Sequence, residues 1–185
     1  MKIGGRVALF MALALCLAVF PFSVQAATPE SLIRDSIDML NGMMKQDDAK
    51  SMADVIDGAK AIAFVPSLVK AGFILGGEYG EGLVLRREGK KWYGPAFYNL
   101  GGGSLGLQIG AQKIALALVI VNDAGVEAFL KSKTKLGADV AVAAGPVGRQ
   151  SEAATDAQMK ASIYSYSMTK GLFAGLSLDG AVISI

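Results

Sequence analysis

The stretch from Trp92 to Gly110, WYGPAFYNLGGGSLGLQIG, constrains the fold of this chain more than any other segment. It combines aromatic residues, a proline and six glycines within nineteen residues. Glycine allows backbone conformations and close approaches that a side chain would prevent. Such a stretch either cradles a phosphate group or lets β-strands pack closely, and this choice separates an enzyme from a binding module.

Three of these glycines, Gly101, Gly103 and Gly106, fit the GxGxxG fingerprint of dinucleotide sites. Asp123 follows at about the distance where such sites carry an acidic residue. In such a site the glycines lead into a helix that crosses back over the sheet. Here Gly110 interrupts the following segment, and few residues remain before the strand expected from Ile114. We therefore favour glycine-permitted strand packing and expect no cofactor.

Residues 1–26 have the features of an export signal. Lys2 and Arg6 precede an apolar run that is too short for a comfortable membrane span, and Val24-Gln25-Ala26 presents small residues where a signal peptidase cuts. We expect cleavage near Ala26 and a periplasmic or secreted protein, with an uncleaved anchor as the alternative. Such a protein can associate peripherally with a membrane.

The chain after Ala26 contains neither cysteine nor histidine. Disulfides are thus excluded, and so are the commonest general base and transition-metal ligand. Removing Lys2 and Arg6 from the 18 basic residues leaves 16, against 16 acidic residues. This balance does not favour nucleic-acid binding, and the length of 27–185 suits a single domain.

Periodicity predicts helices first and strands afterwards. The expected helices span Thr28–Met44, where Leu32, Ile37 and Leu40 recur at helical spacing, then Asp47–Ala59 and Val126–Lys131. The expected strands are Ala61–Val65, Phe73–Gly76, Gly82–Arg87, Lys91–Leu100, Leu105–Ile109, Ile114–Val121, Val140–Ala144, Ile163–Met168, Leu172–Leu178 and Ala181–Ile185. Gly89 marks a hairpin turn. This order predicts an α+β fold.

Two motifs raise the question of catalysis. Ser167 and Lys170 fit an SxxK pattern, but its usual companion motifs are missing and Ser132–Lys135 fits it as well. Glu78 and Glu81 form an acid pair in a glycine-rich segment, which suits general acid–base work only if both side chains reach one pocket. We expect ordinary strand and loop residues, no catalytic residues and no metal site.

Two basic clusters carry the binding hypothesis. Arg86, Arg87, Lys90 and Lys91 surround the expected hairpin turn beside Trp92, and Lys131, Lys133 and Lys135 form a second group. Cations beside interfacial aromatics suit anionic lipid headgroups. The alternative is that these cations keep a hairpin tip soluble and protect strand edges.

A series of glycine and aromatic motifs follows in a fixed order: Ala61–Pro66, Lys70–Phe73, Gly76–Gly77, Gly80–Gly82, Trp92, Pro95–Tyr98, Gly103–Gly106, Gln108–Gln112, Gly145–Pro146, Gly148–Arg149, Tyr164–Ser167 and Lys170–Gly175. This series resembles the SYLF domain family, over about residues 30 to 185. The family is a lipid-binding module of eukaryotic trafficking and actin-associated adaptors, related to the actin-binding domains of yeast endocytic adaptors, with exported bacterial members.

The resemblance implies a noncatalytic, cofactor-free domain that binds phospholipids, phosphoinositides in the eukaryotic members. Family members continue past the position of Ile185, so the last strand is expected to form an unprotected edge. We expect two N-terminal helices packed on a mainly antiparallel, strongly curved or barrel-like sheet. The expected partner is an anionic phospholipid or membrane surface; a protein of the cell envelope is the alternative, and actin does not suit an exported bacterial protein.

Overall fold

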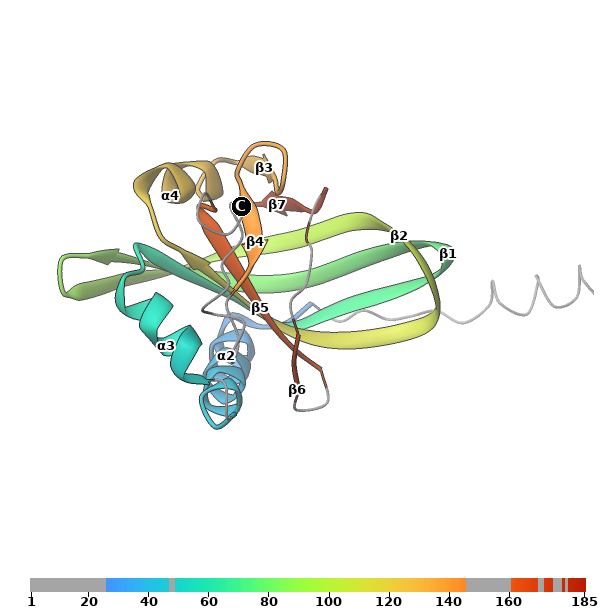
Figure 1. Ribbon diagram of the computed structural model, residues 1–185, viewed down its shortest axis with the longest axis horizontal. Helices are drawn as coiled ribbons and strands as arrows, with labels where there is room; N and C mark the ends of the chain where they lie inside the picture. Colours follow the sequence, from blue (N-terminus) through green and yellow to red (C-terminus); the bar gives the residue numbers. More distant parts are fainter. Residues whose placement is uncertain (1–25, 47–48, 146–160, 170–171, 175–177, 179) are drawn as a thin grey trace, which may run out of the picture.

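The computed structural model describes residues 26–46, 49–145, 161–169, 172–174, 178 and 180–185 (Figure 1). The export signal expected over residues 1–26 lies, apart from Ala26, outside the described residues. So does Lys170, the lysine of the SxxK pattern. None of the helices in the described part of the chain has the length and apolar character needed to cross a membrane.

The N-terminal helix α2 (Pro29–Met43) begins as its sequence predicts. The Thr28 hydroxyl accepts a hydrogen bond from the Ser31 amide at 3.2 Å, and Pro29 occupies the first turn. Its buried face is Leu32, Ser36, Met39 and Met43, whereas Ile37 is 55% exposed. The expected stripe through Ile37 was therefore wrong, because two apolar stripes run side by side on this helix and the methionine stripe packs on the sheet.

The second helix, α3 (Ala49–Asp57), confirms most of the segment expected over Asp47–Ala59. It is followed directly by β1 (Ala61–Glu88) and β2 (Lys91–Ile120), which form one antiparallel hairpin. The pairing runs from Ala61 opposite Ile120 to Glu88 opposite Lys91. Six separately expected strands and the segments between them are thus parts of two continuous strands.

This long hairpin curves back on itself, so that its turn returns toward α3 and α4 (Figure 1). Register shifts interrupt the ladder between Val65 and Leu68, at Pro66, and again between Gly72 and Ile74. Proline cannot donate to the ladder and fits a bulge, and bulges bend and twist strands. Pro66 therefore marks a bulge inside β1. The prediction that a strand ends at this proline was wrong.

The short helix α4 (Asp123–Phe129) follows β2. Shorter strands complete the sheet: β3 (Lys133–Lys135), β4 (Val142–Ala144), β5 (Ile163–Thr169), β6 (Leu172–Ala174) and β7 (Val182–Ser184). The described strands are ordered β3-β7-β2-β5-β4, with β1 also on β2 and β6 on β5. β7 thus lies between β2 and β3, and the expectation of an unprotected last edge was wrong. The polar sequence of β3 had hidden the strand that covers β7.

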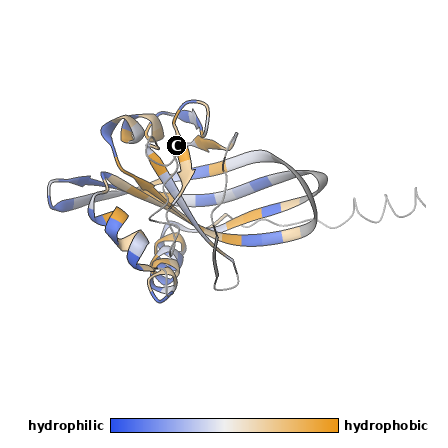
Figure 2. Cartoon of the chain, in the orientation of Figure 1, coloured by the Kyte–Doolittle hydropathy of each residue, from blue (hydrophilic) through white to orange (hydrophobic). Residues whose placement is uncertain are grey.

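Two hydrophobic clusters lie on opposite faces of the sheet. One, inside its curve, contains Leu118, Phe129 and Ile183, and the other packs Met43 and Val119 between the sheet and the two N-terminal helices. Figure 2 shows apolar residues gathered where the strands cross between the helices, while the hairpin turn is hydrophilic. The sheet is antiparallel except for the β4–β5 pair, which confirms the expected α+β fold with a strongly curved, mainly antiparallel sheet.

Candidate functional site

The turn of the long hairpin, residues 86–93, is here called the hairpin tip. Gly89 has a φ of +61°, the left-handed conformation that a tight turn requires and glycine adopts readily. Arg86 lies opposite Tyr93, and Arg87 lies opposite Trp92. Because successive residues of a strand point to opposite faces, the two arginines project on opposite sides of the hairpin.

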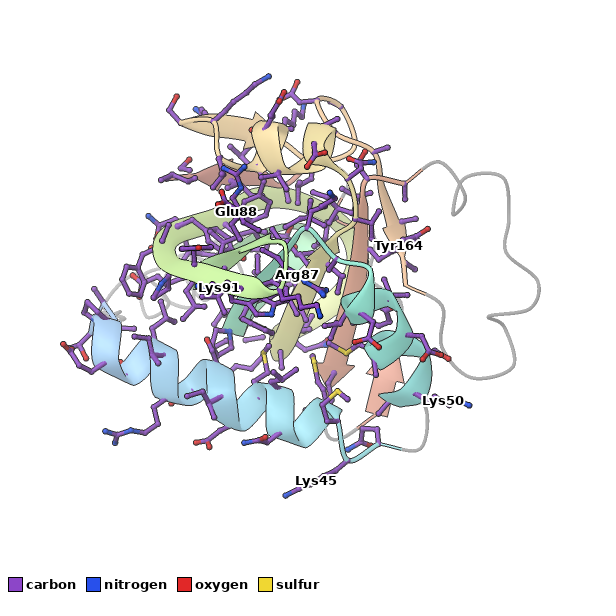
Figure 3. The ribbon with its side chains drawn as sticks, turned by 90° about the vertical axis from the view of Figure 1, so that its left-hand side faces the viewer. Lys45, Lys50, Arg87, Glu88, Lys91 and Tyr164 are labelled. Carbon is purple, nitrogen blue, oxygen red and sulfur yellow. The ribbon has the colours of Figure 1, made fainter. Side chains whose placement is uncertain are left out.

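Arg87 points toward the end of α3 and is held there. Its Nη1 donates to the Asp57 carbonyl at 2.6 Å and its Nε donates to the Gly89 carbonyl at 3.1 Å. The guanidinium also lies 5.7 Å from the centre of the Trp92 ring, a cation–π distance. In Figure 3 the labelled Arg87 lies at the hairpin, on the side that is nearer to α3. These contacts fasten the hairpin tip to the C-terminal end of α3.

The opposite face of the hairpin tip borders an apolar groove of about 200 Å³, here called the tip groove. Its lining comes from the hairpin and from α4: Ala61, Val84, Arg86, Tyr93, Gly94, Ala96, Val126, Phe129 and Leu130. Tyr93 is 52% exposed and Leu130 is 40% exposed. Neither residue was among the predicted binding residues; the position of Tyr93 opposite Arg86 across the expected turn could have indicated it.

One cation lines this groove, and five exposed lysines lie in the turn and in the segment that follows α4. The Arg86 guanidinium lines it and contacts the Glu88 carboxylate at 3.5 Å, and Lys131 follows Leu130 directly in the chain. Lys90 and Lys91 are exposed in the turn, and Lys133 and Lys135 are exposed on β3 while Thr134 between them is buried. Within the described residues, no carboxylate forms a salt bridge with any of these five lysines.

A second apolar groove, of about 230 Å³, lies on the helix side of the hairpin and is here called the helix groove. It is lined by Ile33, Ser36, Ile37, Leu40, Phe64, Leu83, Leu85 and Pro95. Leu83 and Leu85 face this groove, whereas their neighbours Val84 and Arg86 face the tip groove. The two-residue alternation of the strand thus gives the end of the hairpin one apolar groove on each face.

The carboxylate pair does not meet in one pocket. Glu78 is buried, and its Oε2 lies 2.6 Å from the Lys70 ammonium nitrogen. Glu81 stands three residues later on the same strand and so points to the opposite face, where its Oε2 accepts a hydrogen bond from the Ala27 amide at 2.7 Å. The geometry needed for shared acid–base chemistry is therefore missing at this pair.

The other chemical motifs lie inside strands. Gly101, Gly103 and Gly106 belong to β2, which continues as a strand to Ile120 where a dinucleotide site would begin a helix. Ser167 is buried in β5. Among the described side chains, no group of three or more acidic residues is placed to hold a metal ion.

Comparison with known proteins gives a consistent family. Residues 101–185 match the Ysc84 family, described as a Las17-binding protein and actin regulator. An SH3 domain-containing protein of Schizosaccharomyces pombe is 37% identical over 133 residues, which is 70% of this chain and 31% of that protein. The human SH3 domain-containing YSC84-like protein 1 is 36% identical over 133 residues, or 71% of this chain and 39% of the relative.

A yeast relative, LAS seventeen-binding protein 3 of Saccharomyces cerevisiae, is 34% identical over 134 residues, which is 70% of this chain and 29% of that protein. The chain thus spans about a third of the length of the curated relatives that it matches. These relatives are named for binding and for domain content, and none of the three names describes an enzyme. These matches confirm the resemblance predicted from the sequence, and the chain belongs to the Ysc84 (SYLF) domain family.

Proposed function

We propose that this protein is an exported, noncatalytic module that binds anionic phospholipid headgroups with the end of the molecule formed by the hairpin tip and α4. The observation that carries the proposal is the tip groove: an apolar groove lined by Arg86 and by exposed Tyr93 and Leu130, with Lys131 next to Leu130 in the chain. A lipid surface matches both parts of this site: its anionic headgroups suit the cations, and its acyl chains suit the apolar groove.

Each class of side chain has a separate task in this proposal. Arg86, Lys90, Lys91 and Lys131 contact phosphate oxygens, and each near-surface cation contributes about 1 kcal/mol. Tyr93 and Leu130 enter the interfacial layer from the tip groove, and Trp92 enters it from the opposite face of the turn, beside Arg87; amphipathic aromatic rings are favourable in this layer. Lys133 and Lys135 extend the positive surface. Arg87, which is bound to Asp57 and Gly89, positions the hairpin tip for these contacts.

Flotation with lipid vesicles tests this assignment. Phosphatidylcholine vesicles are compared with vesicles that also contain phosphatidylglycerol, using the wild type and the variant Lys90→Glu/Lys91→Glu. Because two contributions of about 1 kcal/mol are lost, we expect at least about thirtyfold weaker binding to the anionic vesicles. Raising the salt concentration should weaken the binding of the wild type until it approaches that of the variant.

The matched control is Lys45→Glu/Lys50→Glu, which changes the net charge equally at two exposed lysines near the junction of α2 and α3 (Figure 3). This control should retain most of the binding. Equal losses in both double variants would mean that only net charge matters, and equal recovery with neutral and anionic vesicles would overturn the headgroup assignment. Both variants keep Arg87, so the anchor of the hairpin tip is unchanged.

The second candidate is a protein-interaction module of the cell envelope. The comparisons support protein interaction in general, because the yeast relative is named for binding Las17. The helix groove favours it, because Ile33 and Ile37 remain 37% and 55% exposed beside an apolar depression. Crosslinking in the host, followed by delipidation, would support it if a discrete partner is kept by the wild type and lost in Ile33→Asp/Ile37→Asp. Binding that disappears with the lipid would oppose it.

A further inference from the structure

The nitrogen of Ala27 makes a contact that no sequence pattern indicated. It donates to Glu81 Oε2 at 2.7 Å, across 54 positions of the chain. Glu81 lies in the returning half of β1, opposite Asn99 of β2. The start of the described chain is thus tied to the middle of the long hairpin by a single carboxylate.

Neighbouring groups hold this carboxylate in place. The Tyr79 hydroxyl lies 3.3 Å from Glu81 Oε1 and 3.1 Å from Asn99 Oδ1. Burial, followed by the charge of Glu81 and the hydrogen bond to it, raises the pKa of Tyr79 above its ordinary value, so its hydroxyl keeps a proton to donate. One oxygen of Glu81 is thereby occupied by Tyr79, and the other points at Ala27.

The Ala26–Ala27 peptide bond is also the bond at which the expected export signal would be cut. Hydrolysis breaks the bond between the Ala26 carbonyl carbon and the Ala27 nitrogen. The oxygen of water enters the new Ala26 carboxylate, and the nitrogen takes up protons to become an α-ammonium group. The amide donor seen at Glu81 would then become a full positive charge at the same place.

We propose that Glu81 is the binding site for the α-amino group that cleavage of the Ala26–Ala27 bond creates. This inference rests on the export and cleavage that form part of the proposed function. The carboxylate already makes this hydrogen bond charge-assisted, and a positively charged donor turns it into an ion pair with both partners ionised. It fixes the processed N-terminus on β1, directly before the start of α2 that the Thr28 cap sets.

The position of α2 makes a counter-charge necessary. Its cap residue, Thr28, follows Ala27 directly, and the N-terminal end of a helix carries a partial positive charge. An α-ammonium group beside that end would be repelled unless a carboxylate neutralised it. Glu81 supplies that carboxylate from the sheet, and Glu30 adds a second one in the first turn.

The surroundings have room for an ammonium group. Depressions of about 270 and 240 Å³ flank this point, and Ala27, Leu32 and Glu81 line both of them. The nitrogen protons that do not contact Glu81 can therefore reach water. Every described helix and strand lies after Ala27, so a chain that starts at this residue keeps the whole described fold.

Melting temperatures of three preparations test the role of Glu81. The protein is prepared with Ala27 as a free N-terminus, with Ala27 acetylated, and with Ala26 retained as one additional residue. We expect the free Ala27 form to melt about 2–4 °C above both others, the shift that about 1 kcal/mol causes in a domain of this size. In Glu81→Gln the three forms should melt together.

Glu30→Gln is the matched control, because it removes a carboxylate near the same helix end without touching the contact to Ala27. The difference between free and acetylated Ala27 should persist in this variant. Equal melting of free and acetylated Ala27 in the wild type, or an undiminished difference in Glu81→Gln, would overturn the assignment of Glu81.

The cleavage itself is checked separately, by the intact mass of the protein recovered from its host. A mass that corresponds to a chain beginning at Ala27 supports the proposal. A mass that corresponds to another first residue overturns the cleavage on which the proposal rests. The melting experiment uses a defined N-terminus, so the two failures are distinguishable.

Discussion

Tyr98 places a phenol ring at the centre of the molecule. The ring meets Phe129 edge to face, with centroids 5.1 Å apart and an interplanar angle of 81°. The residue is 3% exposed, and its hydroxyl finds no hydrogen-bond partner within the described part of the chain. An unpartnered buried hydroxyl costs about 1–3 kcal/mol, so the ring stabilises the core and the hydroxyl does not.

We predict that Tyr98→Phe raises the free energy of unfolding by about 1 kcal/mol at neutral pH, because the ring contact stays and the unpartnered hydroxyl is removed. Burial raises the pKa of Tyr98 above its ordinary value. The unfolded tyrosine ionises near pH 10 while the folded one keeps its proton, so stability is complete below pH 10 and falls above it, by about 1.4 kcal/mol per pH unit.

Tyr98→Phe should therefore lessen the loss of stability between about pH 10 and 11, as measured by urea unfolding. Burial, and then the neighbouring Tyr164, raise the pKa of Tyr166 as well. The free energy of unfolding of the double variant Tyr98→Phe/Tyr166→Phe should accordingly fall less steeply with alkaline pH than that of Tyr98→Phe. An alkaline slope that is identical in the wild type and both variants would contradict this explanation.

The β1 strand as an element depends on glycine where it returns across its own first half. A Cβ at Gly82 would lie 2.5 Å from the Phe64 carbonyl oxygen and 2.6 Å from the Tyr98 ring. A Cβ at Gly80 would lie 2.5 Å from the Val65 side chain. The curvature of the hairpin therefore requires glycine at these two positions, for close packing and not for a special backbone angle.

Gly82→Ala should lower the free energy of unfolding by about 3 kcal/mol or more, because a backbone carbonyl and a buried ring must both move. Gly103→Ala is the control within the glycine-rich run, since a Cβ there meets no atom within 4 Å. It should leave stability unchanged or raise it by up to about 1 kcal/mol. Urea unfolding measures both, and similar losses in both variants would contradict the packing explanation.

At the scale of the whole molecule, β2 joins the two hydrophobic clusters. Leu116 and Leu118 enter the cluster inside the curved sheet, while Ala117 and Val119 enter the cluster beneath α2 and α3. All four are fully buried. Both faces of the sheet are thus sealed by successive residues of one strand, which makes the clusters interdependent.

We predict that Leu118→Ala and Val119→Ala each shift one common unfolding transition, by about 2–5 and about 2 kcal/mol respectively. Circular dichroism at 222 nm reports the helices, and Trp92 fluorescence reports the hairpin tip. The two signals should change together in both variants. Earlier melting of the helices alone in Val119→Ala would show that the clusters unfold independently.

The sequence by itself determined the local structure and the family of this protein. The Thr28 cap, the Gly89 turn and the change from helical to strand periodicity act within a few residues, and the ordered glycine and aromatic motifs identify the Ysc84 (SYLF) family. It also located the basic residues of the hairpin tip and weakened the dinucleotide interpretation through Gly110.

Only the tertiary structure decided which residues meet. It joined the separately expected strands into one hairpin, turned Arg86 and Arg87 to opposite faces, placed β7 between β2 and β3, and brought Glu81 to Ala27. The physical reason is that capping, turns and periodicity depend on neighbours along the chain. Contacts between residues some fifty positions apart depend instead on the summed curvature of a long hairpin, which bulges and close-packed glycines set and which no local pattern records.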